Sequence, residues 1–286
     1  MEIIKIEGSR AFSLRDISTT AQKGYSNKKK LKAELKENIK RMAELQNMMY
    51  AQDRYALLIV IQAMDAAGKD SLIRRAMSGL NPQGTQVFSF KRPSSEELDH
   101  DYLWRAHKRL PERGRIGIFN RSYYEEVLAV RVHDLVRKRK IPKALITGDI
   151  WHERFTHIKN FEEYLCANGT QTLKLFLHIS KEEQERRFLD RLEDPSKNWK
   201  FSAADLLERE HWDEYRRCYE NAIAGTATNH APWYIIPADN KWYARLMVSQ
   251  IIIGRLEALD LKYPRLSADQ TARIDEYRKH LGDSDV

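Results

Sequence analysis

The hydrophobic pattern of the chain alternates between short apolar runs and longer segments with helical character. The runs that suit strands cover residues 55–61, 85–90, 115–120, 172–179 and 233–237. The segments expected to be helical cover residues 28–50, 71–77, 94–110, 127–136, 148–168, 180–192, 205–224 and 241–259. This alternation predicts an α/β fold, a three-layer sandwich with a parallel central sheet and helices on both faces.

The same pattern divides the chain into an arm, one domain and a tail. Residues 1–27 have no sustained period and are interpreted as an N-terminal arm, and residues 263–286 form a polar C-terminal tail with weak helical character. The alternating elements fill residues 28–262, which we interpret as one domain. Within it, a highly charged segment at about residues 180–205 is interpreted as a helical lid.

One stretch, YALLIVIQAMDAAGKDS at residues 55–71, joins a strand to a helix through a loop of small residues. This is the context of a phosphate-binding P-loop, because backbone N–H groups of the loop and of the helix N-terminus converge on an anion. Lys69 adds a point charge for the phosphate oxygens. The residues expected to bind phosphate here are Ala66, Ala67, Gly68, Lys69, Asp70 and Ser71. The alternative is an ordinary turn in which Lys69 is solvated.

The loop departs from the P-loop consensus at two positions. Ala63 stands where the consensus has glycine. Asp70 stands where the consensus has the serine or threonine whose hydroxyl usually binds Mg²⁺, and Ser71 comes one place later. We therefore expect Asp65, inside the loop, to supply an oxygen ligand, because Mg²⁺ takes one or two carboxylates together with phosphates.

A second group of candidate residues follows the strand at residues 115–120. Asn120 can bind a phosphate or a metal-bound water, and Arg121 can chelate a phosphate with two hydrogen bonds. Glu125 is a candidate Mg²⁺ ligand. The alternatives are a solvated arginine at a strand end and, for Glu125, ordinary first-turn helix chemistry. Because ligands bind beyond the carboxyl ends of parallel strands, we expect this group to lie near Asp65.

Basic side chains gather in further places. The charged segment carries Arg187 and Arg191, which share a helix face, so a lid that brings arginines to a phosphate is one interpretation. The other is a salt-bridged surface, since acidic residues are interleaved with the basic ones. The phosphate groove is expected to include, in addition, Arg74, Arg75, Lys91, Arg92 and Lys200.

Charge and cysteine content narrow the class of protein. The 286 residues carry 49 Lys and Arg against 41 Asp and Glu, a formal net charge of +8 that favours polyanionic partners. No apolar run approaches the length of a membrane span and the N-terminus lacks the apolar core of a signal peptide, so we expect no membrane partner. Two cysteines provide neither a disulfide framework nor a metal site, which makes the cytoplasm the expected compartment.

Several motifs together resemble the family-2 polyphosphate kinases. They are QAMDAAGKD at residues 62–70, NPQG at 81–84, DYLWR at 101–105, FNRSYYE at 119–125, WKF at 199–201 and APWYIIPA at 231–238. The resemblance implies a P-loop kinase-like fold with a lid. It implies reversible, Mg²⁺-dependent transfer of the terminal phosphate of inorganic polyphosphate to AMP, ADP or other nucleotides, with Mn²⁺ as a substitute metal. The catalytic residues that it implies are Asp65, Lys69, Arg121, Arg187 and Arg191.

The resemblance also indicates a subgroup. Asn120, where many members have Asp, and Asp70 are similar to the class III enzymes that phosphorylate both nucleoside mono- and diphosphates, whereas Ser71 stands where members usually have Gly. We expect a homo-oligomer, a dimer or a tetramer, and no nucleic-acid partner. Two other functions stay open: a conventional nucleotide kinase with ATP as donor, and a non-catalytic polyanion-binding protein. Asp65 and Lys69 argue against the second, because binding alone needs no Mg²⁺ carboxylate.

Overall fold

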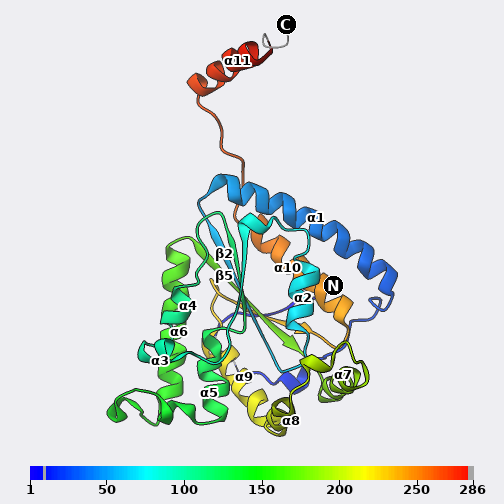
Figure 1. Cartoon of the computed structure of the whole chain (residues 1–286), viewed down its shortest axis with the longest axis vertical. Coiled ribbons are helices and arrows are strands. Elements are labelled where there is room, and N and C mark those ends of the chain that lie inside the picture. Colours follow the sequence, from blue (N-terminus) through cyan, green and yellow to red (C-terminus); the bar gives the residue numbers. More distant parts are fainter. Residues whose placement is uncertain (9–10, 283–286) are drawn as a thin grey trace.

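Within residues 1–8 and 11–282, which the computed structural model describes, a six-stranded sheet forms the centre of the protein (Figure 1). Residues 9 and 10 of the predicted arm and 283–286 of the predicted tail lie outside the described residues. The strands in sheet order are β1 (Ile4–Ile6), β6 (Trp233–Pro237), β5 (Thr170–His178), β2 (Ala56–Ala63), β4 (Ile116–Asn120) and β3 (Thr85–Ser89). Strands β2 to β6 pair in parallel, so the prediction of an α/β fold around a mostly parallel sheet is confirmed.

The edge strand β1 lies in the segment that we interpret as an N-terminal arm, and the sequence analysis did not predict it. β1 pairs antiparallel with β6, and Ile6 at its end is buried. Three residues are too few for a hydrophobic period to be recognised in the sequence. Farther along the arm, the carbonyl oxygens of Leu14 and Ile17 accept hydrogen bonds from His178 Nε2, at 2.9 and 3.1 Å. The arm is thereby held across the carboxyl end of β5.

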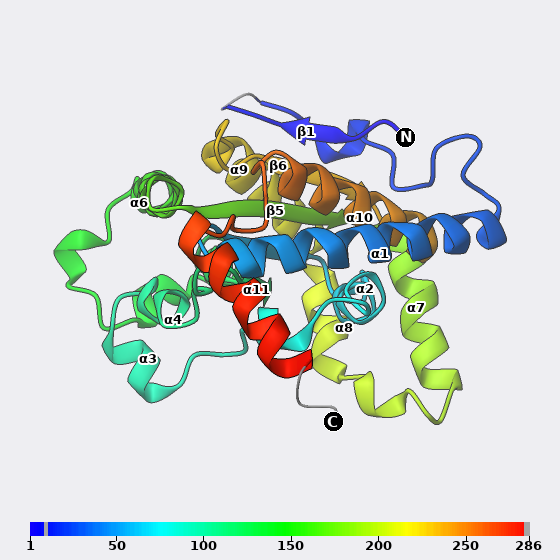
Figure 2. The same ribbon diagram turned by 90° about the horizontal axis from the view of Figure 1, so that it is seen from above.

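Helices cover both faces of the sheet, as predicted. On one face lie α1 (Lys28–Gln52), α2 (Lys69–Ala76) and α10 (Lys241–Glu257), and on the other lie α6 (Ile150–Ala167) and α9 (Trp212–Thr226) (Figure 1). The short helices are α3 (Ser95–Asp99), α4 (Trp104–His107) and α5 (Ala129–Val132). The segment at about residues 180–205, which we interpret as a lid, contains α7 (Lys181–Glu193) and the start of α8 (Ala203–Glu210), and a loop connects the two helices (Figure 2). In the predicted tail, α11 (Ala268–Gly282) stands apart from the sheet (Figure 1).

The strand that leads into the P-loop is the most completely buried element. All eight positions of β2 are buried, which an unbroken apolar run predicts for a central parallel strand. Its β-branched residues Ile59, Val60 and Ile61 have no exposed surface, and each contributes about 1.5–3 kcal/mol through burial. This rigid strand fixes the start of the loop that follows.

No helix in the described part of the chain is both long enough and apolar enough to cross a membrane.

The helix predicted over residues 94–110 is divided into α3 and α4. Ser94 caps α3 as expected, and its side chain and that of Glu97 form a reciprocal capping box. The backbone then becomes extended at His100, with φ −107° and ψ 171°. The Asp101 carboxylate accepts a hydrogen bond from the Leu103 N–H at 2.9 Å, which starts a separate turn.

Two further predicted helices are interrupted as well. Residues 127–136 contain α5 and parts of two 3₁₀ turns, because Asp134 adopts a left-handed conformation with φ 45°. Residues 205–224 belong to two helices, α8 and α9, which meet at His211. These breaks matter for function, because they place short helices around the carboxyl edge of the sheet.

Candidate functional site

The loop after β2 turns sharply into the start of α2. Gly68 precedes the helix with φ 103°, a left-handed conformation that favours glycine, and Ala66 is also left-handed, with φ 57°. α2 begins at Lys69, so its first backbone N–H groups have no partner within the helix and point toward the loop. This is the arrangement that the P-loop spacing predicts.

The Lys69 ammonium is folded against its own loop. Nζ donates to the carbonyl oxygens of Ala63, at 3.1 Å, and Met64, at 3.4 Å, and the residue is buried. Burial lowers the pKa of Lys69, and the Arg121 guanidinium lowers it further, whereas Asp65 raises it. The positive charge therefore lies beside the turn that would bind a phosphate, held by carbonyl dipoles.

The two residues after Lys69 have different partners. The Ser71 hydroxyl donates to the Gly68 carbonyl at 3.0 Å, so it is engaged with the backbone. Asp70 is exposed, and its Oδ1 accepts a hydrogen bond of 2.6 Å from Asn120 Nδ2 at the end of β4. Asp70, which departs from the P-loop consensus, thus contacts the neighbouring strand end.

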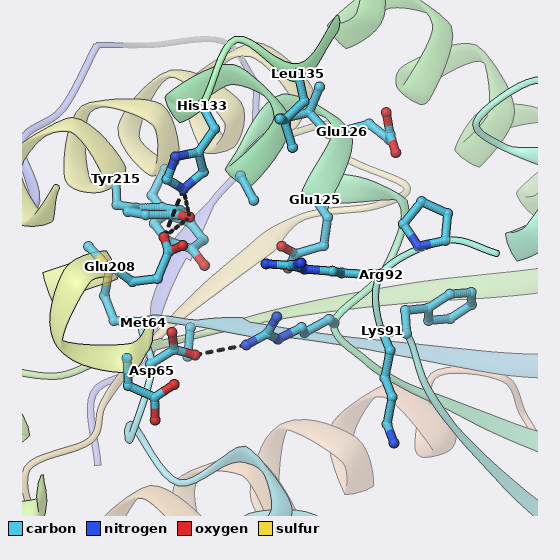
Figure 3. Close-up of a pocket in the computed structure, with 18 of the residues that line it drawn as sticks. Met64, Asp65, Lys91, Arg92, Glu125, Glu126, His133, Leu135, Glu208 and Tyr215 are labelled. Carbon is cyan, nitrogen blue, oxygen red and sulfur yellow. Dashed lines mark hydrogen bonds and ion pairs between the residues drawn. The ribbon is translucent and has the colours of Figure 1, made fainter. Parts of the chain in front are cut away.

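Asp65 and Arg121 form an ion pair between the ends of β2 and β4 (Figure 3). Arg121 Nη2 lies 2.8 Å from Asp65 Oδ1. Burial lowers the pKa of Arg121, but the Glu125 and Asp65 carboxylates raise it to a value above its usual one. Burial raises the pKa of Glu125, against the effects of Arg121 and Lys69. In the amide orientation that satisfies both of its ends, Gln62 donates to Glu125 Oε1 at 3.1 Å.

Asp65, Arg121 and Glu125 line a cavity of about 280 Å³ at the carboxyl edge of the sheet (Figure 3). Lys91 and Arg92, after β3, line it as the sequence predicts and are exposed. Opposite them, Glu208 of α8 accepts a hydrogen bond from Tyr215 of α9 at 2.7 Å and lies 2.9 Å from His133 Nε2. The sequence analysis did not predict that His133, Glu208 and Tyr215 line the cavity. These residues come from three separate elements and have no local spacing in common.

Arg187 does not line this cavity. Its guanidinium is buried and donates to the carbonyl oxygens of Ala67 (2.6 Å) and Ala238 (2.6 Å), among others, and Nε donates to Glu183 at 2.7 Å. Burial lowers the pKa of Arg187, whereas Glu183 raises it. In this geometry Arg187 connects α7 to the P-loop and to the end of β6.

The other predicted basic residues are distributed over three surfaces. Arg191 of α7 pairs with Asp205 of α8 at 3.3 Å and does not line the cavity, so the structure does not bring Arg187 and Arg191 together there. Lys200, between α7 and α8, is exposed, with Nζ 4.9 Å from the centre of the Trp199 ring. Arg74 and Arg75 are exposed on α2 and lie outside the cavity lining.

The carboxylates suit a metal ion that is shared with a substrate. Within residues 1–8 and 11–282, no group of three or more His, Cys, Asp or Glu side chains could hold a metal ion. Asp65 and Glu125 both line the cavity beside Lys69 and Arg121. One or two carboxylates that are completed by phosphate oxygens are the donor set typical of Mg²⁺. The residues present therefore fit a divalent ion that binds together with phosphates.

Comparisons with known proteins find close relatives over most of the chain. A family model described as Polyphosphate kinase 2 (PPK2) matches residues 25–264. The chain is 50% identical over 259 residues to an ADP-polyphosphate phosphotransferase of Rhodopseudomonas palustris, covering 90% of each protein. It is 46% identical over 226 residues to an AMP/ADP-polyphosphate phosphotransferase of Meiothermus ruber, covering 79% of this chain and 81% of that relative. The crystal structure of Polyphosphate Kinase 2 from Arthrobacter aurescens TC1 is similar, with a TM-score of 0.85 and 37% identity over 96% of this chain and 99% of that chain.

Proposed function

Because the chain belongs to the Polyphosphate kinase 2 family, we propose that it transfers the terminal phosphate of inorganic polyphosphate to both AMP and ADP. Phosphate transfer between polyphosphate and nucleotides follows from the family, and the use of both acceptors is our proposal. The observation that supports phosphoryl transfer most strongly is the P-loop beside the Asp65–Arg121 ion pair, both members of which line the cavity. Phosphoryl transfer requires positioned positive charge more than covalent help from the protein.

The residues of the P-loop and of the end of β4 have distinct roles in this reaction. An oxygen of the acceptor's terminal phosphate attacks the terminal phosphorus of polyphosphate, the bond to the bridging oxygen breaks, and polyphosphate leaves one phosphate shorter. Lys69 and the N-terminus of α2 stabilise the negative charge on the transferring group. Arg121 binds the phosphates with its guanidinium once they compete with Asp65 for it. Residues 180–205 close over the site as a lid, within a domain of residues 28–262.

Family members are generally dependent on a divalent metal. We take the ion to be Mg²⁺, which Mn²⁺ can replace, and assign Asp65 and Glu125 as the protein groups that hold it together with phosphate oxygens. When bound, the ion supplies positive charge that neutralises the phosphates of donor and acceptor. The hydrogen bond from Gln62 holds the Glu125 carboxylate in position.

Asn120 is the residue on which the acceptor range depends. A carboxylate at this position would lie beside Asp70, and two adjacent negative charges would repel acceptor phosphates unless a metal neutralised them. Neutral Asn120 relaxes that demand, because it donates through Nδ2 and accepts through Oδ1. This supports phosphorylation of acceptors with one or two phosphates.

A coupled luminescence assay tests the function. Purified protein, Mg²⁺ and ADP are incubated with polyphosphate as the only phosphoryl source, and Lys69→Ala serves as the blank. We expect ATP to form with wild type. No ATP under these conditions, together with activity when ATP and AMP are supplied instead, would identify a conventional nucleotide kinase. Binding of polyphosphate without any turnover would identify a polyanion-binding protein. A homo-oligomer and a cytoplasmic location stay predictions.

A further inference from the structure

A group of hydrogen-bonded polar side chains lies inside the core, on the face of the sheet that α6 and α9 cover (Figure 1). Glu162 of α6 and Lys174 of β5 form an ion pair, with Nζ 2.7 Å from Oε2, and neither side chain has exposed surface. The other Glu162 oxygen, Oε1, accepts hydrogen bonds from the hydroxyls of Tyr123, at 2.9 Å, and Tyr124, at 2.8 Å. Lys174 Nζ also donates to the carbonyl oxygen of Thr226, at the end of α9, at 2.8 Å. We call these five residues the buried cluster.

The two tyrosines of the buried cluster are uncharged hydrogen-bond donors. Burial raises the pKa of Tyr123 and of Tyr124 well above the usual value, and the Glu162 carboxylate raises both further. Each hydroxyl therefore keeps its proton and shares it with Glu162. Burial lowers the pKa of Lys174, and the Glu162 carboxylate acts against this effect.

Stability alone does not explain a charged pair at this depth. The desolvation of two charges can exceed the gain from their attraction, and apolar residues of similar volume often give an equally or more stable fold. An apolar pair, however, has no oxygen that accepts hydrogen bonds from two neighbouring tyrosines. The Glu162–Lys174 pair therefore provides directional contacts that specify where the segment after β4 lies.

That segment carries two residues of the cavity. Arg121 has a left-handed backbone, with φ 61°, which is unfavourable for a residue with a side chain and persists only where the surrounding structure holds it. The chain then enters a 3₁₀ turn, where the buried Ser122 hydroxyl accepts a hydrogen bond from the Tyr124 N–H at 3.1 Å. Arg121 and Glu125 line the cavity, whereas the two tyrosines between them do not. The tyrosine hydroxyls therefore anchor this turn from the side of the core.

We propose that the buried cluster positions the site for phosphoryl transfer: its two tyrosines hold the backbone that presents Arg121 and Glu125 to the cavity. Glu162 and Lys174 are thus positioning residues, which act on the reaction without touching a substrate. The inference rests on the roles proposed above for Arg121 and Glu125. A displacement of about 1 Å at a group that positions a substrate can lower a rate about 10²-fold, so loss of the anchor should reduce kcat.

Two double variants separate positioning from stability. Both contain Lys174→Met, so neither has a buried charge; one adds Glu162→Gln, whose amide oxygen still accepts from the tyrosines, and the other adds Glu162→Leu, which has no acceptor. Melting temperatures followed by circular dichroism show whether each variant is folded. With polyphosphate and ADP, we expect kcat of Glu162→Leu/Lys174→Met to fall about tenfold or more, with a smaller change in either KM. Glu162→Gln/Lys174→Met should keep most of the wild-type kcat.

A double-mutant cycle identifies the residue through which the cluster acts. Arg121→Lys alone should lower kcat, and adding Glu162→Leu/Lys174→Met to it should cause little further loss, because the positioned guanidinium is already absent. Equal losses in the Arg121→Lys and wild-type backgrounds would overturn the proposal.

Two other results would also overturn it. Equal kcat values for the Gln and Leu double variants would mean that the tyrosine hydrogen bonds have no part in turnover. If the Leu double variant does not fold, Tyr123→Phe replaces it, since it removes one hydroxyl and leaves both charges; an unchanged kcat would then contradict the proposal. ATP formation by wild type tests the proposed function separately from all of these variants.

Discussion

The amide of Asn120 donates a 2.6 Å hydrogen bond to the carboxylate of Asp70, joining the end of β4 to the first turn of α2. In Asn120→Asp the two carboxylates face each other and require a cation between them. We expect the ratio of kcat/KM for AMP to that for ADP to change and the demand for Mg²⁺ to rise, while folding is retained. Initial rates with both acceptors at several Mg²⁺ concentrations measure this.

The exchange variant Asn120→Asp with Asp70→Asn is the control. It restores one amide and one carboxylate at the same two positions, so the raised Mg²⁺ demand should disappear. If Asn120→Asp leaves the acceptor ratio unchanged, Asn120 does not select the acceptor.

Lys69 is expected to be essential for turnover. Lys69→Ala removes a charge beside the turn that binds the transferred phosphate, so kcat should fall on the order of 10²-fold or more. Lys36→Ala, an exposed lysine of α1, removes the same charge far from the loop and should keep the wild-type rate. Near-normal turnover of Lys69→Ala would remove the basis for the P-loop assignment.

Salt should affect the two substrates differently. A long polyanion that is held by several lysines and arginines releases many counterions, so its KM should rise steeply with ionic strength, and the nucleotide KM less. Steady-state kinetics at 50 to about 200 mM salt, the range over which such binding weakens strongly, give both slopes. Parallel slopes would contradict a dedicated polyanion surface.

Docking of the arm should depend on pH through His178. Burial lowers the pKa of this imidazole, while its Nε2 donates to Leu14 and Ile17. Below the unfolded-state pKa of about 6.5, the unfolded chain binds the proton more readily than the folded one. The contribution of neutral His178 to the free energy of unfolding is therefore fully present above that pH. It falls as the pH is lowered toward the pKa of His178 in the folded protein. Urea unfolding between about pH 7.5 and 5.5 should show a larger loss for wild type than for His178→Gln. Identical losses would exclude this histidine as the cause.

Much of the fold could be predicted because its signals are local. The unbroken apolar run of β2, the helical period of α1 and the Gly68-Lys69 pair each depend on neighbouring residues alone. β1 could not be predicted, because three residues show no period. The breaks at His100 and Asp134 depend on backbone conformations that polar side chains select locally, against a pattern that suits a helix.

The site residues that follow the end of a strand could be predicted from the sequence. Asp65 and Arg121 each follow a buried strand, so parallel pairing brings them together. The position of Arg187 could not be predicted, since its carbonyl partners come from the P-loop and from the end of β6. A basic residue on a charged helix has the same sequence pattern whether it contacts a substrate or supports a loop. We therefore propose Arg187 as a positioning residue.

The most direct test of the central claim is a time course that begins with AMP, polyphosphate and Mg²⁺ and no other nucleotide. Quantified by chromatography, ADP should rise first and then fall while ATP appears, because the same site accepts one and then two phosphates on the acceptor. Accumulation of ADP without ATP, or no reaction of AMP while ADP is converted, would contradict the claim that one site phosphorylates both acceptors.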